Sequence, residues 1–95
     1  MRVRWLRRAL NDLDAAEAWI ARDNPGAASE IVLIIVKTVG LLKAQPGLGR
    51  PGRVPGTREL VVPETMFIVP YRVREDVVEV LRVYHAARRW PEQLD

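Results

Sequence analysis

The chain contains no cysteine and only one histidine, His85. Without cysteine it has no disulfide bond, no thiol nucleophile and no cysteine-based zinc site. A single histidine also argues against a histidine-rich metal site. We therefore expect this protein to use neither a metal ion nor another cofactor.

The chain also lacks a long apolar run. The longest, Ile31 to Val36, is bracketed by Glu30 and Lys37, and it is far shorter than the roughly 20 residues that a membrane span needs. The arginines near the N-terminus are not followed by the apolar segment of a secretory signal. We expect a cytoplasmic protein with no membrane partner.

Lysine is scarce, because thirteen of the fifteen basic residues are arginine, and the net charge is +3. The planar guanidinium of arginine pairs well with carboxylates and phosphates. This favours a partner rich in acidic groups, although a plain solvated surface gives much the same count. With 95 residues, of which 48% are hydrophobic, residues 1–95 are expected to form one small folded domain.

The first half of the chain predicts one short strand and two helices. Residues 1–5 alternate between apolar and basic side chains, as in a half-buried strand. Apolar residues then recur at three- and four-residue spacings to about Arg22, which predicts a first helix. Asn24 and Pro25 are typical of a helix start, so a second helix is expected from Pro25 to about Gln45. The short turn between the helices predicts an antiparallel hairpin.

The second half predicts a loop and three strands. Residues 46–57 are rich in proline and glycine and form the loop. Strands are expected at 58–62, 66–73 and 77–84, joined by turns short enough for antiparallel hairpins. Pro70 lies inside the middle strand, where its missing N–H predicts a bulge or a local edge. The order β-α-α-β-β-β predicts an α+β fold, with the N-terminal helix hairpin packed on one face of a curved, mostly antiparallel sheet.

Several short motifs follow one another along nearly the whole chain. After the opening strand, Ala9 to Leu13 and Asn24-Pro25, they are Pro46-Gly47-Leu48-Gly49-Arg50, Gly56-Thr57-Arg58-Glu59-Leu60, Tyr71-Arg72-Val73 and Arg82-Val83-Tyr84-His85-Ala86-Ala87-Arg88-Arg89-Trp90. Each is weak alone, but in this order and spacing they resemble the RelE/ParE toxins of bacterial toxin–antitoxin systems.

The resemblance implies the RelE/ParE toxin fold and one of two activities. RelE-like toxins enter the ribosome and cut messenger RNA, whereas ParE-like toxins inhibit DNA gyrase without catalysing a hydrolysis. Both kinds are neutralised by a cognate antitoxin, which lays a helix and an extended segment over the toxin surface.

Two positions favour the ParE-like branch. RelE-like enzymes supply catalytic groups from basic residues on the sheet and from a tyrosine near the C-terminus. In an approximate register, the arginine of the middle strand falls at Ile68 and the tyrosine near Glu92. Because an aliphatic side chain cannot stabilise a phosphorane, we predict a gyrase inhibitor that acts by binding and is not an enzyme.

His85 supports the alternative, a ribosome-dependent mRNA endonuclease. With Arg58, Arg82 and Arg88 it would form a basic cluster at the end of the last strand, and histidine titrates near neutrality. A structural role is favoured about two to one, in which His85 hydrogen-bonds the backbone where the strand meets the tail. A lone histidine without a matched partner is a weak sign of a catalytic site.

Other basic residues are candidates for contact with the target or an acidic partner. Arginines in a glycine- and proline-rich loop are often only solvated, and an aromatic residue can simply pin the tail to the domain. A third hypothesis also stays open, in which a toxin fold has lost toxicity and only binds its antitoxin. The candidates for target binding are Arg50, Arg53, Arg58, Arg88, Arg89 and Trp90.

Overall fold

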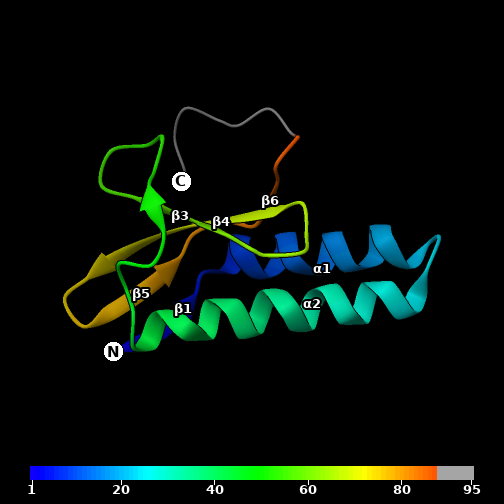
Figure 1. Ribbon diagram of the computed structural model, residues 1–95, viewed down its shortest axis with the longest axis horizontal. Helices are drawn as coiled ribbons and strands as arrows, with labels where there is room; N and C mark the ends of the chain where they lie inside the picture. The colour runs from blue at the N-terminus through cyan, green and yellow to red at the C-terminus, as the bar shows by residue number, and fades with distance from the viewer. Residues whose placement is uncertain (88–95) are drawn as a thin grey trace.

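The sheet is organised around strand β4 (Phe67–Arg74), which pairs with β3, β5 and β6 (Figure 1). The computed structural model describes residues 1–87. Within them the strand order is β1-β5-β4-β3-β2, and every pair is antiparallel except β1 with β5. The other strands are β1 (Arg2–Trp5), β2 (Arg50–Pro51), β3 (Arg58–Val61), β5 (Val77–Val80) and β6 (Tyr84–His85).

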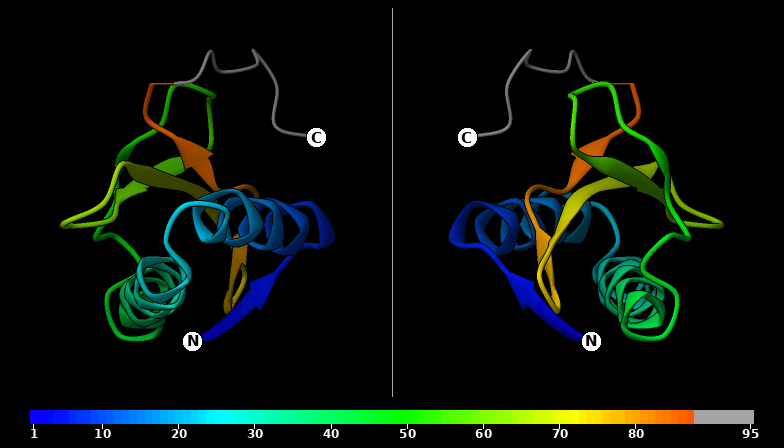
Figure 2. Two further views of the ribbon diagram at one scale, coloured as in Figure 1. Left: turned by 90° about the vertical axis from the view of Figure 1, so that its right-hand side faces the viewer. Right: turned by 90° about the vertical axis from the view of Figure 1, so that its left-hand side faces the viewer.

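Two helices, α1 (Arg7–Ala21) and α2 (Pro25–Gly40), form the predicted antiparallel hairpin (Figures 1 and 2). The second helix begins as its sequence predicts. Oδ1 of Asn24 accepts a hydrogen bond from the N–H of Ala27 at 3.1 Å, and Pro25 occupies the first helical position.

A 3-10 turn, η1 (Leu41–Lys43), follows α2 directly, so the α-helix stops a few residues before the predicted end near Gln45. Within the described residues, the continuous helix Pro25–Lys43 is the one segment long and apolar enough, by length and composition, to cross a membrane. The sequence analysis considered only the apolar run from Ile31 to Val36, so it did not reveal how long and apolar the whole helix is. One side of this helix belongs to the core, where Ile35 and Leu42 are fully buried.

The core lies between the helix hairpin and one face of the sheet, as predicted. Alternate residues of the strands point toward the helices, so the middle strand contributes Phe67, Val69 and Tyr71. The helices contribute one apolar stripe each. The buried cluster is Ala9, Ile35, Val39, Leu42, Leu60, Val62, Phe67, Val69, Tyr71, Val78, Val80 and Val83.

The strand predicted over residues 77–84 is split into β5 and β6 by a bulge opposite Pro70. Between the two ladders, Val69 and Pro70 of β4 face three residues of the other strand, Leu81–Val83. Pro70 has no N–H to donate, and its carbonyl accepts the N–H of Leu81 at 2.9 Å. The bulge at Pro70 is therefore confirmed, whereas the single continuous strand is wrong.

Candidate functional site

A fully buried tyrosine, Tyr71, anchors the proline- and glycine-rich loop to the sheet. Its hydroxyl accepts a hydrogen bond from the N–H of Gly49 at 2.8 Å and donates one to the carbonyl of Pro46 at 2.7 Å. A Cβ at Gly49 would lie 2.6 Å from Cε1 of Tyr71, so a larger residue there must displace the ring. The core therefore holds this part of the loop in one conformation.

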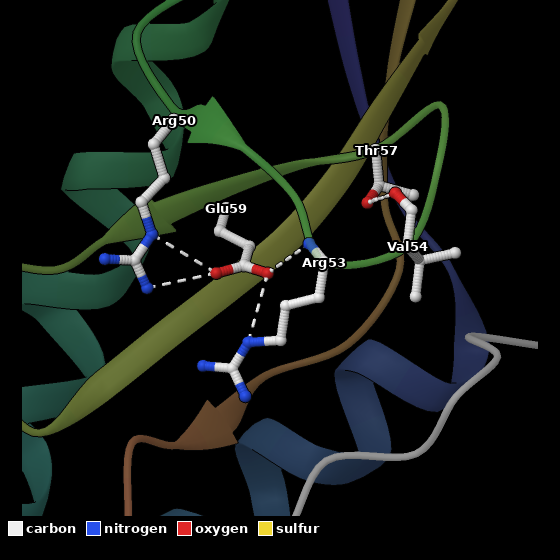
Figure 3. A network of polar contacts seen from close by, with 5 residues as sticks. All are labelled: Arg50, Arg53, Val54, Thr57 and Glu59. Atoms are coloured by element: carbon white, nitrogen blue, oxygen red, sulfur yellow. Dashed lines mark hydrogen bonds and ion pairs between the residues drawn. The ribbon is translucent and has the colours of Figure 1, made fainter.

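Glu59 of β3 is a carboxylate with only 3% of its side chain exposed, and it binds two arginines of the loop (Figure 3). It accepts hydrogen bonds from Nη2 of Arg50 at 3.0 Å and from the backbone N–H of Arg53 at 2.9 Å. Nε of Arg53 lies 3.5 Å from the same carboxylate. About half of each arginine side chain stays exposed, so Glu59 fixes two cations that still face solvent.

The contact between Glu59 and Arg50 follows from strand register. The two residues are opposite each other in the short ladder between β2 and β3. The sequence analysis placed all of residues 46–57 in a loop, and this assignment is wrong at Arg50 and Pro51. Two paired residues are too few to produce a strand pattern in the sequence.

Arg58, at the start of β3, completes the same network. Its Nη1 donates to the carbonyl of Gly49 at 2.7 Å and lies 3.4 Å from the carbonyl of Gly47. The three central motifs of the sequence therefore meet in space, because the loop, β3 and β4 each contribute to one set of polar contacts. Arg58 is held rigidly, and it binds the loop through this nitrogen.

Arg82 lies in the bulge and is bound to Asp12 of α1. Its Nε and Nη2 donate to the two carboxylate oxygens of Asp12 at 2.7 and 3.0 Å, and the N–H of Val83 donates to Oδ2 at 3.0 Å. The hydrogen bonds from Arg82 to Asp12 are the main reason that the pKa of Arg82 is raised above its usual range. The guanidinium also lies 4.9 Å from the centre of the Tyr84 ring. Arg82 therefore joins α1 to the sheet.

His85 ends strand β6 beside Phe67. Its Nδ1 accepts the N–H of Ala87 at 3.2 Å, and its ring meets that of Phe67 edge-on with the centroids 5.7 Å apart. The backbone contact is the structural role that the sequence analysis favoured for this residue.

An apolar groove with a volume of about 480 Å³ runs between α1 and the pair of strands β4 and β6. Trp19, a residue with 65% of its surface exposed, forms part of its wall, and the small residues Ala15 and Ala16 are also in its lining. Among the described residues, the lining contains no arginine. It consists of Asp12, Ala15, Ala16, Trp19, Phe67, Val83, His85 and Ala87.

Comparison with known proteins identifies the family. A sequence model described as ParE toxin of type II toxin-antitoxin system, parDE, matches residues 3–90. The chain belongs to the ParE toxin family. It is thus a type II toxin–antitoxin toxin, as the resemblance implied.

Two relatives and one solved structure cover most of this ParE-family toxin. A Sinorhizobium fredii protein named putative toxin Y4kP is 46% identical over 93 residues, with 98% of this chain and 96% of the relative covered. Toxin RelE2 of Caulobacter vibrioides is 33% identical over 86 residues, with 90% and 96% covered. A structure of the chromosomal ParDE TA system from P. aeruginosa matches at 35% identity with a TM-score of 0.80, covering 90% of this chain and 95% of that chain. The predicted α+β toxin fold is confirmed.

Within the described residues of this ParE-family toxin, Arg58 and His85 of the hypothetical nuclease cluster lie apart, and Arg82 is bound to Asp12. Arg58 pairs with Tyr71 and His85 pairs with Phe67, and these two positions are separated by about 13 Å along β4. Arg50 and Arg53, in contrast, are brought together by Glu59. The remaining predicted residues, Arg88, Arg89, Trp90 and Glu92, lie outside the described residues, so their roles stay predictions.

The sequence analysis missed a second cluster of arginines, on the sheet face opposite the helices. Glu79 of β5 lies between Arg4 and Arg72 in the sheet register. Nε of Arg72 is 2.7 Å and Nε of Arg74 is 4.0 Å from Oε1 of Glu79. The hydrogen bond from Arg72 lowers the pKa of Glu79, and the charges of Arg74 and Arg4 add to this against the effect of burial. The signal was the two-residue spacing of arginines along β1 and β4, which places each pair on one face.

Replacing Glu79 with glutamine is expected to make the fold less sensitive to acid. Because the pKa of Glu79 is below its ordinary value of 4.5, its charged form contributes stability that is present above this value and lost as the pH falls through the folded pKa. We expect the wild type to be more stable by about 1 kcal/mol at neutral pH, and this difference to shrink below about pH 4. Urea unfolding over this pH range measures it. An equal pH dependence of the two proteins would contradict the expectation.

Proposed function

We propose that this toxin inhibits DNA gyrase by binding to it, without catalysing a hydrolysis, and that a cognate antitoxin neutralises it in the cytoplasm. One observation carries the proposal. Arg58 and Arg82 are engaged in structural contacts, so the groove beside His85 has no arginine among its described lining residues. Membership of the ParE toxin family supports the same conclusion.

The chemistry of RNA cleavage explains why this observation matters. Cleavage without a metal needs a base, an acid and cations that stabilise the phosphorane. Arg82 is a poor acid, because its pKa is raised and two of its nitrogens donate to Asp12. Ile68, where an enzyme would have its strand arginine, is nearly buried and carries no charge. His85 would have to act in a mostly apolar groove.

Arg50 and Arg53 are the best described candidates for contact with the target. Both guanidinium groups are half exposed, and Glu59 orients them before any partner binds. Side chains that are already ordered lose less conformational freedom on binding, so they favour association with an acidic surface. Arg88, Arg89 and Trp90 remain candidates from the sequence alone.

Two features suit the antitoxin. The apolar groove between α1 and β6 can accept the apolar face of a helix. At the edge of the sheet, β1 directs the N–H groups of Arg2 and Leu6 toward the β5 side, where they donate to Asp76 and Val80. The alternate backbone groups, at Val3 and Trp5, therefore face the other edge, where an extended segment can pair.

Expression of the toxin with His85→Ala tests the mechanism. We expect growth arrest at a dose within about twofold of that of the wild type, because no acid or base is needed. DNA breakage that depends on gyrase should accompany the arrest, and messenger RNA in a translation extract should stay intact. Ile68→Arg serves as the companion variant and should not create message cleavage.

Two results would contradict the proposal. Message cleavage by the wild type that falls about 100-fold or more in His85→Ala would identify a ribosome-dependent endonuclease. Expression of the wild type without any growth arrest would identify a toxin fold that has lost toxicity and only binds an antitoxin.

A further inference from the structure

Helix α2 carries a second stripe, of small and apolar residues, that the fold does not use. The first stripe of the helix faces the core. The second consists of residues spaced by three, four, three and four positions, which is the spacing of a helix that packs along another helix. We call it the outer stripe of α2, and it consists of Gly26, Ser29, Leu33, Val36 and Gly40.

The centre of the outer stripe is exposed and apolar. Leu33 has 58% and Val36 has 43% of its surface accessible, although both are large and apolar. Figures 1 and 2 show α2 at the outside of the molecule, with one side turned away from the sheet and from α1. Leu33 and Val36 are three positions apart on the helix, so they form one apolar patch flanked by small residues.

We propose that the outer stripe binds a second copy of this chain, so that two α2 helices pack antiparallel about a twofold axis. The stripe is self-complementary in this arrangement. When Leu33 of one copy lies opposite Val36 of the other, Ser29 lies opposite Gly40. The large side chains then meet at the centre, and the small residues let the backbones approach on either side.

Charge supports the same geometry. Glu30 and Lys37 are both exposed, and they lie seven positions apart on one flank of the stripe. Neither has an ion pair within residues 1–87. In an antiparallel helix pair equivalent flanks meet, so Glu30 of each copy faces Lys37 of the other. A parallel pair would not bring these two residues together, because each flank would then meet the opposite one.

The dimer leaves the other surfaces free. The groove between α1 and β6 contains no residue of α2 among its described lining, and the arginines on Glu59 come from the loop and β2. The inference therefore stands apart from the proposed function, because it requires neither gyrase nor an antitoxin.

Sedimentation equilibrium of the full-length chain, produced in a cell-free extract, tests the dimer. Because the interface is small, we expect a monomer–dimer equilibrium with a dissociation constant on the order of 10 µM. Leu33→Asp should abolish dimers, whereas Met66→Asp, a matched change at an exposed apolar residue outside α2, should not. Wild type that stays monomeric at about 100 µM would overturn the proposal, as would dimers unaffected by Leu33→Asp.

Charge reversal identifies the partner as a second copy in antiparallel order. Glu30→Lys and Lys37→Glu should each weaken dimers about tenfold, because two symmetry-related attractions become repulsions. An equal mixture of the two variants should form mixed dimers about as tight as the wild type, since a lysine of one variant faces a glutamate of the other at both contacts and both attractions are restored. Asp14→Lys on α1 is the control and should have no effect. Single variants that weaken dimers without recovery in the mixture would overturn the antiparallel arrangement.

The outer stripe could instead bind lipid vesicles or the antitoxin while the chain alone stays monomeric. This result would overturn the proposal that a second copy binds there.

Discussion

Glu59→Ala is expected to lower the free energy of unfolding by about 3 to 5 kcal/mol, because it leaves two arginines and one backbone N–H without their shared acceptor. The carboxylate is almost fully buried and binds Arg50 and Arg53 at once. A small domain has roughly 5 to 15 kcal/mol of stability in total, so this one change removes a large share. Urea unfolding at neutral pH measures the loss.

Two further variants separate the network from simple loss of volume. Glu59→Gln keeps the size and one acceptor oxygen, so it should lose about half as much as the alanine variant. Arg50→Ala should cost much less in the Glu59→Ala background than in the wild type, because the pair is already broken. Glu17→Ala, at an exposed residue, is the control and should stay within about 0.5 kcal/mol of the wild type. Equal losses from Glu59→Ala and Glu17→Ala would show that the network contributes no stability.

Asp12→Asn is expected to lower the free energy of unfolding by about 2 to 3 kcal/mol and the melting temperature by roughly 10 °C. Asparagine retains one acceptor oxygen and would point an N–H group at the guanidinium of Arg82. Arg82 and the N–H of Val83 would then share one acceptor in place of two. Because the pair is not fully buried, we expect less than the loss at a deeply buried ion pair.

The region that Asp12→Asn destabilises distinguishes loss of the ion pair with Arg82 from a general loss of helix stability. Asp12 joins α1 to the bulge, so hydrogen exchange should increase first at Val83 and in β6. Asp14→Asn, on the same helix, is the matched control and should change neither the melting temperature nor the exchange of β6. A loss below about 0.5 kcal/mol in Asp12→Asn would mean that the ion pair only compensates for its own desolvation.

Most of the fold could be predicted because its signals are local. Asn24 and Pro25 start a helix through their own side chain and ring, and the apolar spacing shows which face of α1 is buried. Pro70 predicts a bulge because it has no N–H, whatever its neighbours are. The position of the bulge was predicted correctly. The break that it causes between β5 and β6 was not predicted, because this break depends on which three residues lie opposite Val69 and Pro70.

The candidate site was less predictable because its contacts join distant positions. Asp12 and Arg82 are 70 residues apart, and no spacing rule connects them. Arg82 was therefore considered as a catalytic cation, although its contacts are structural. The sequence analysis gave Glu59 no role beyond that of a strand residue, since its burial depends on its pairing with the two-residue strand β2.

The order of the two helices and the longer strands, the helix start at Asn24 and the bulge at Pro70 follow from short-range chemistry, and the sequence alone predicted them. Long-range packing determined which arginines are bound, and that Arg58 and His85 do not meet. The physical reason is that backbone geometry and capping act over a few residues, whereas burial and ion pairing depend on strand register and on how the helices lie against the sheet.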